Sequence, residues 1–205
     1  MLGLPKSTEL EKPQQIPKTT LFAIFQMNAA EKARINKDIA KIVITNEFSK
    51  EKISIAEGNE VKNFFVMNIT MKNKNFDDRN IIKIAKLIPQ RILMVLDYQD
   101  EVKLAVYHTK LLQTDWHTKE DYIIEIKGMN LEAVWENIIA QIGEVIIQGD
   151  TSLEEQLSIK EKREKLCKDI EKLEKQARNE KQPNKKFDIV KKFNALQKRL
   201  KEMGG

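Results

Sequence analysis

The pattern in this chain that comes closest to a catalytic motif is Glu125-Ile126-Lys127. The residues around it, Tyr122 to Lys127, predict a β-strand, and alternation along a strand would place both charged side chains on one face. An E-x-K pair with an upstream aspartate is typical of metal-dependent nucleases. Glu125 and the aspartate would hold Mg²⁺, and Lys127 would orient or polarise the attacking water. The candidates for the aspartate are Asp97, Asp100 and Asp115.

The same residues also have a simpler interpretation as exposed charges on a strand. Charged residues make up 33% of the chain, so an E-x-K pair arises readily by chance. Glu101-Val102-Lys103 is a second match, and it lies beside a predicted turn where charges are expected. We therefore expect no cofactor unless the nuclease hypothesis holds, in which case Mg²⁺ is required.

Three further residues could carry chemistry singly. His108 shares an apolar strand face and is expected to be hydrogen-bonded there, since no partner for a general base is identifiable. Trp116 lies in a polar loop and is a candidate partner-binding residue that could stack on a base or peptide; the alternative is a tryptophan folded over the edge of the sheet. Cys167 is the only cysteine, which excludes an internal disulfide. It lies in a charged, helix-forming segment, so we expect its thiol on a helix surface.

Several enzyme classes are excluded by missing motifs. The seven glycines form neither GxGxxG nor GxxxxGK[ST], which argues against Rossmann dehydrogenases and Walker-type NTPases. HExxH and GxSxG are also missing, and the two histidines form no metal-binding cluster. No apolar stretch is long enough to span a bilayer, and the first residues lack a signal-peptide pattern, so we expect a cytoplasmic protein without a membrane partner.

The basic charge is concentrated at the C-terminal end. From Thr151 onward there are 16 Lys and Arg against 10 Asp and Glu, a net charge of +6, whereas the first 150 residues hold 20 against 21, a net charge of −1. An asymmetry of this size is compatible with a nucleic acid or an acidic protein as partner.

This basic segment predicts two long helices folded back on each other. Ser152 and Glu155 form a capping box, and Pro183 interrupts the run that follows. Apolar residues then recur with heptad spacing on both sides of the break, which predicts a coiled-coil seam. They are Leu166, Ile170, Leu173 and Ala177, followed by Ile189, Phe193, Leu196, Leu200 and Met203.

Cations of the second helix are the candidate nucleic-acid contacts, because acidic residues interleave with them less than in the first. They are Lys185, Lys186, Lys191, Lys192, Lys198 and Arg199. The alternative is a solvated coiled-coil face, in which such charges serve solubility.

The first 150 residues predict an α+β domain. Asn28, Asp77 or Asp78, and Asn130 are predicted helix caps, and the first of these helices would carry Ile35, Ile39 and Ile42 on one stripe. Strands are predicted at 41–48, 61–71, 91–97, 102–109 and 122–127, after an extended N-terminal arm. We thus expect a mixed, largely antiparallel sheet of about five strands with packed helices in residues 1–150, and a long antiparallel helical hairpin in residues 151–205.

The whole chain resembles a bacterial family known as domain of unknown function 4391. The residues that carry the resemblance are Leu4-Pro5-Lys6-Ser7-Thr8-Glu9, Ile16-Pro17-Lys18, the segment from Ile88-Pro89 to Tyr98, Trp116, Phe187 and Asn194. None of them forms a catalytic motif. The resemblance implies a protein without established activity, encoded near helicase and methyltransferase genes of restriction-like defence systems.

Three functional hypotheses follow. The first is a non-catalytic accessory protein of a bacterial DNA-processing or phage-defence system that docks a partner, such as a helicase, a methyltransferase or a second copy of itself, through the hairpin. The second is a nucleic-acid-binding subunit that uses the second hairpin helix. The third is the Mg²⁺-dependent nuclease described above.

Overall fold

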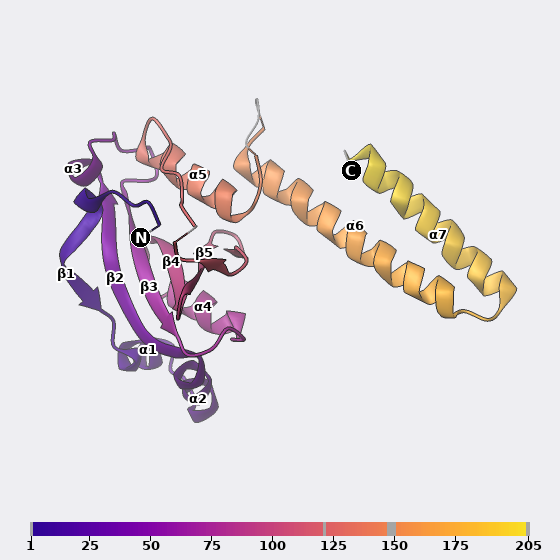
Figure 1. Ribbon diagram of the computed structural model, residues 1–205, viewed down its shortest axis with the longest axis horizontal. Coiled ribbons are helices and arrows are strands. Elements are labelled where there is room, and N and C mark those ends of the chain that lie inside the picture. Colours follow the sequence, from indigo (N-terminus) through magenta and orange to yellow (C-terminus); the bar gives the residue numbers. More distant parts are fainter. Residues whose placement is uncertain (1, 121, 147–150, 204–205) are drawn as a thin grey trace. The chain divides into compact units, whose positions relative to one another are not determined.

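One mixed sheet organises the first part of the chain in this computed structural model, which describes residues 2–120, 122–146 and 151–203 (Figure 1). Within those residues the strand order is β1-β2-β3-β4-β5-β6, with β7 paired to β5. Neighbouring strands are antiparallel except β3 and β4, which are parallel and joined through helix α4. The strands are β1 (Glu9–Gln15), β2 (Ile39–Ser49), β3 (Asn63–Met71), β4 (Arg91–Tyr98), β5 (Glu101–Tyr107), β6 (Leu111–Gln113) and β7 (His117–Thr118).

Three helices cover one face of this sheet. They are α1 (Lys18–Ile24), α2 (Ala29–Asp38) and α4 (Asp78–Ala85). Their buried residues Leu21, Ile35 and Ile81 belong to one apolar cluster with alternating residues of the central strands, such as Met67 and Met94. Alternation within a strand sends every second side chain to this face, so the strands and helices share a continuous core.

The opposite face packs against helix α5 (Leu131–Ile142). Phe64 of β3 stacks on Phe48 of β2, with ring centroids 4.5 Å apart, and lies 5.1 Å from the ring of Trp135 on α5. Trp135 is buried and belongs to the core on this side of the sheet. The sheet is thus covered on both faces over part of its area, as its largely apolar central strand β4 predicts.

The helix starts follow the predicted capping residues. The Asn28 side chain accepts a hydrogen bond from the backbone N–H of Glu31 and completes a capping box. Asp77 and Asn130 accept from the N–H groups of Arg79 and Ala133 and begin α4 and α5 in the same way. Two short helices, η1 (Lys6–Thr8) and α3 (Lys50–Ile53), complete this part of the chain.

Two details of the predicted elements were wrong at the N-terminal end. The helical stripe was expected to include Ile39 and Ile42, but α2 ends at Asp38 and both isoleucines begin β2. They open a run of β-branched residues, which favours a strand. The extended N-terminal arm contains β1, an exposed edge strand whose Pro13 lies within an irregular pairing to β2.

The predicted strand at residues 122–127 was also wrong, because none of its described residues joins the sheet. The N–H of Glu125 instead donates to the side-chain oxygen of Gln141 on α5 at 2.9 Å, and the Gln141 amide donates back to the Glu125 carbonyl at 2.8 Å. A side-chain amide thus takes the hydrogen bonds that a neighbouring strand would otherwise make. The fold class, α+β with a C-terminal helical hairpin, is confirmed.

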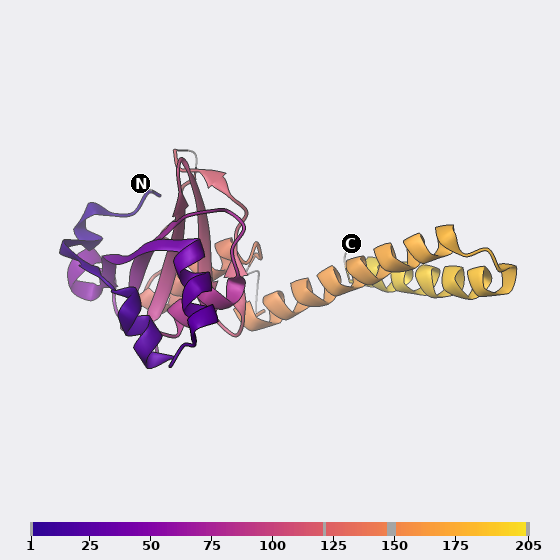
Figure 2. The same cartoon turned by 90° about the horizontal axis from the view of Figure 1, so that it is seen from below.

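The hairpin consists of α6 (Leu153–Asn179) and α7 (Pro183–Glu202), which lie side by side in both views (Figure 2). The contacts divide the chain into two compact units, Met1–Glu144 and Val145–Gly205, so the hairpin forms a unit distinct from the sheet and its helices. Among the described residues, no helix is both long enough and apolar enough to cross a membrane.

Candidate functional site

The packing of α6 against α7 decides which residues the hairpin presents to solvent. Ser152 caps α6 with a complete capping box, and Pro183 occupies the first turn of α7, where its missing N–H costs nothing. The predicted heptad residues of both helices lie on the facing sides: Leu166 is buried, and the others are half-buried. The predicted seam is therefore confirmed, and it fixes the rotation of α7 about its axis.

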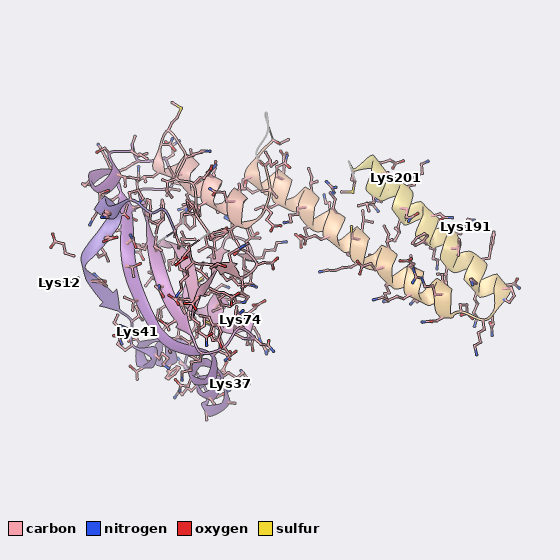
Figure 3. The ribbon with its side chains drawn as sticks, in the orientation of Figure 1. Lys12, Lys37, Lys41, Lys74, Lys191 and Lys201 are labelled. Carbon is pink, nitrogen blue, oxygen red and sulfur yellow. The ribbon has the colours of Figure 1, made fainter. Side chains whose placement is uncertain are left out.

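The side of α7 opposite the seam carries apolar and cationic residues together. We call this side the outer face; helical spacing places on it Phe187, Lys191, Asn194, Ala195, Lys198, Lys201 and Glu202, with Val190 and Asp188 at its two margins. Figure 3 shows Lys191 and Lys201 extending from α7 away from α6. Phe187 is 71% exposed and Val190, one turn along, is 37% exposed. An exposed apolar pair among lysines is a combination that binding surfaces use.

Further cations of α7 lie beside the seam rather than on the outer face. Lys185, Lys192 and Arg199 recur every seven residues on one flank, and Lys186 lies on the other. All six predicted cations are exposed. Within the described residues, the only ion pair of α7 joins Lys198 Nζ to Glu202 at 4.0 Å, so most of this charge is not neutralised by the hairpin itself.

Helix α6 differs from α7 in its charge balance. It holds eight Lys and Arg against seven Asp and Glu, whereas α7 holds seven against two. Pairs one turn apart, such as Arg178 with Glu174 at 2.5 Å, neutralise charges along α6. Cys167 is exposed on this helix, as predicted. An anionic partner would therefore be attracted to α7 rather than to α6.

The E-x-K residues have a different environment from the one a nuclease site requires. The Glu125 carboxylate forms an ion pair with Lys127 itself, and both side chains are mostly exposed, at 59% and 67%. The pair lies outside the sheet, on the segment that Gln141 holds. Among the described residues, no three His, Cys, Asp or Glu side chains are grouped closely enough to hold a metal ion.

Asp97, the third residue of that hypothesis, is engaged elsewhere. It lies near the end of β4, where its carboxylate pairs with Lys119 Nζ at 2.8 Å. The Asn68 side-chain amide approaches the same carboxylate at 3.5 Å. These contacts explain the position of Asp97 as part of a polar surface on the sheet.

Trp116 is half-buried in an aromatic group at the edge of the sheet. Its ring lies 6.4 Å from Phe76 and 6.3 Å from Tyr98 in edge-on arrangements. The ammonium group of Lys103 lies 5.8 Å from the centre of the Trp116 ring. The Trp116 ring is thus held by contacts within the chain. A partner that stacks on this ring would have to compete with these contacts.

Comparison with known proteins places the chain in a family without assigning an activity. Residues 2–200 match the family described as Domain of unknown function (DUF4391). The chain belongs to this family. No curated protein and no solved structure matches it. The DUF4391 resemblance seen in the sequence is confirmed over nearly the whole chain, and the functional argument depends on the surfaces described above.

The exposed apolar pair of α7 is the part of this surface that the sequence analysis missed. In the sequence, Phe187 contributes only to the family resemblance. The signal that could have found it is its helical phase, because Phe187 and Val190 fall outside the heptad seam that includes Ile189 and Phe193.

Proposed function

We propose that this member of the DUF4391 family is a non-catalytic accessory protein whose hairpin docks an acidic protein partner through the outer face of α7. The observation that carries the proposal is the exposure of Phe187 and Val190 on a helix whose cations are largely unpaired. Interfaces of this kind combine an aromatic anchor with a charged surround.

The apolar pair and the cations have separate roles in this proposal. Burying an exposed phenylalanine supplies the affinity, because aromatic side chains bury about 150–250 Å² each and dominate interface energetics. The lysines supply attraction over a distance and the choice of partner, since complementary charge raises association rates more than it raises affinity. A partner with an acidic rim around an apolar pocket fits both.

The family resemblance supports a helicase or methyltransferase of a bacterial DNA-processing or defence system as the partner. The second candidate function is nucleic-acid binding by α7, favoured by the seven cations of this helix and the single ion pair that they form within the described residues.

The test compares full-length variants for binding to the partner captured from the native host and then purified. We expect Phe187→Ala to weaken binding about 10-fold or more, the range of an anchor residue. Lys191→Glu combined with Lys198→Glu should slow association and reduce its salt dependence.

Matched controls separate docking from general effects. Met129→Ala removes a side chain that is 94% exposed in the other unit, and Lys162→Glu with Lys168→Glu reverses two charges of α6. Both should bind as the wild type does. If Phe187→Ala binds normally, while Lys191→Glu with Lys192→Glu abolishes a salt-sensitive binding to duplex DNA, the nucleic-acid alternative replaces the docking proposal.

A further inference from the structure

Four lysines lie at or beside the junction where α2 passes into β2. Two of them donate hydrogen bonds to this junction: Lys18 Nζ on α1 donates to the Ile39 carbonyl at 3.1 Å, and Lys72 Nζ after β3 donates to the Asn36 carbonyl at 2.6 Å. These carbonyls belong to the last turn and the C-cap of α2, the negative end of the helix dipole. The end of the helix thus holds two ammonium groups near each other.

The other two lysines lie on the junction itself. Lys37 is in the last turn of α2, and its carbonyl accepts a hydrogen bond from the Asn73 side chain at 3.3 Å. Lys41 is opposite Thr70 in the pairing of β2 with β3, next to the strand end from which Lys72 follows. Figure 3 shows Lys37 and Lys41 at the end of the sheet where α1 and α2 lie in Figure 1. We call the four residues Lys18, Lys37, Lys41 and Lys72 the lysine end.

The charge of the lysine end is not balanced locally. Within the residues that the structure describes, none of these four lysines forms an ion pair, and Lys37, Lys41 and Lys72 are exposed. The adjacent carboxylate, Asp38, is buried, and its Oδ2 accepts from the Asp77 N–H at 3.2 Å and the Asn80 amide at 2.9 Å.

Like charges at this end repel one another. Burial lowers the pKa of Lys18 below its ordinary value, and the neighbouring Lys72 lowers it further. Four lysines against the one adjacent carboxylate, Asp38, leave a local formal excess of three positive charges in a part of the chain, residues 1–150, whose net charge is −1. Cations that repel each other and outnumber the nearby carboxylates are relieved by binding an anion.

We propose that the lysine end is a second binding surface, distinct from the outer face of α7, and that it contacts the phosphate backbone of a nucleic acid. Phosphates spaced along a strand can meet ammonium groups that come from several elements, whereas a single small anion would need them gathered around one point. Lysine acts as a point charge on a flexible stem, so the contact requires no particular base sequence.

The test uses the full-length chain and a fluorescently labelled duplex DNA of about 20 base pairs, with anisotropy measured over a series of salt concentrations. The variant is Lys37→Glu with Lys41→Glu; Lys18 and Lys72 are left intact because they bond to the carbonyls of α2. We expect the Kd to rise about 10-fold or more near 0.1 M salt. The slope of log K against log salt should become shallower by about 1.8, which corresponds to two lost phosphate contacts.

The matched control is Lys6→Glu with Lys12→Glu, which changes the net charge equally at two exposed positions in η1 and β1. It should bind DNA within about two-fold of the wild type, because charges away from the contact are screened. Far-UV circular dichroism establishes that both variants are folded.

Four results would overturn the proposal. They are a wild type that fails to bind DNA even at low salt, an equal loss in the control variant, full binding by Lys37→Glu with Lys41→Glu, and displacement of DNA by polyglutamate as effectively as by unlabelled DNA. The last result would assign the lysine end to an acidic protein. A Lys191→Glu, Lys198→Glu variant that keeps its DNA affinity would show that the contact belongs to the lysine end rather than to α7.

Discussion

The two units of this protein bury their apolar residues to different extents. In the first unit, large side chains such as Phe48, Phe64 and Ile35 are completely inaccessible to solvent. In the hairpin, Leu153 and Leu166 are the buried apolar residues of the described chain, and the remaining seam positions are half-buried. Two helices in contact can cover only one side of each other, whereas a sheet with helices on both faces encloses its core.

This difference separates stability from recognition. The sheet and its helices supply the stability of the first unit, since burial of apolar surface is the dominant favourable contribution to folding. Most residues of the hairpin are exposed to solvent, and many of them are charged. Because few of them are needed for packing, more of its sequence can serve the recognition of a partner. Its outer face and the lysine end of the first unit are therefore surfaces of different origin: one belongs to a single helix, and the other exists only when the sheet has formed.

The largest expected effect is on the core of the first unit. Phe64→Ala should lower the free energy of unfolding by about 3–5 kcal/mol, because it leaves a cavity between Phe48 and Trp135. Denaturant unfolding followed by tryptophan fluorescence measures the change. Phe187→Ala makes the same substitution at an exposed position and should leave this transition within about 0.5 kcal/mol of the wild type. If both variants lost the same free energy of unfolding, the proposed difference in burial between the two units would be contradicted.

A smaller and more local effect is expected in the hairpin. Leu166→Ala should cost about 2 kcal/mol, the lower end of the range for leucine truncation, because the seam is partly open to solvent. Hydrogen exchange should show faster exchange in α6 and α7 and unchanged protection in the sheet. Cys167→Ala, at the next and exposed position, is the control and should change neither. Faster exchange throughout the sheet would mean that the two units unfold together.

The smallest effect concerns pH and tests an ion pair of the first unit. Hydrogen bonds from Arg79 hold the pKa of Asp77 below its ordinary value. A carboxyl with a depressed pKa stabilises the folded state above its unfolded pKa, near 4, and loses this contribution as the pH falls through the folded pKa. The melting temperature should therefore fall below about pH 4.

Asp77→Asn keeps a capping side chain but removes the charge, so the variant should lose less stability on acidification than the wild type does. Glu11→Gln on the edge strand β1 is the control, because this exposed residue has no ion pair within the described part of the chain. An unchanged acid sensitivity in Asp77→Asn would assign the effect to other carboxylates.

Local signals predicted most of the fold. Capping residues such as Asn28 and Asn130 located the helix starts because a cap acts through hydrogen bonds within one turn. The heptad residues of the hairpin predicted its seam for a similar reason, since both helices carry the same spacing. The errors arose where residues far apart in the sequence determine the local structure. Strand β1 forms because it pairs with the edge of β2, and the segment around Glu125 is held by Gln141 rather than by a strand.

The candidate surfaces divide in the same way. The cations of α7 were predicted from composition, because a helix places its own residues on one surface. The lysine end could not be predicted, since Lys18, Lys37, Lys41 and Lys72 are brought together by strand pairing and by the end of α2. The sequence could likewise not show whether Glu125, Lys127 and Asp97 have the geometry of a nuclease site, because this depends on three-dimensional contacts. In the structure Glu125 pairs with Lys127, and Asp97 pairs with Lys119.

The strand order of the sheet has a consequence for how the protein is made. From β1 to β6 each strand pairs with the one before it in the chain, including the parallel pair β3 and β4. A chain is synthesised from its N-terminus, so when each strand leaves the ribosome, the preceding strand with which it pairs has already been made. Pairing between neighbours in sequence also keeps the loops to be closed short, which favours rapid folding. The sheet can thus grow in the order of synthesis, and the lysine end, built from residues 18–72, is complete before the hairpin has been translated.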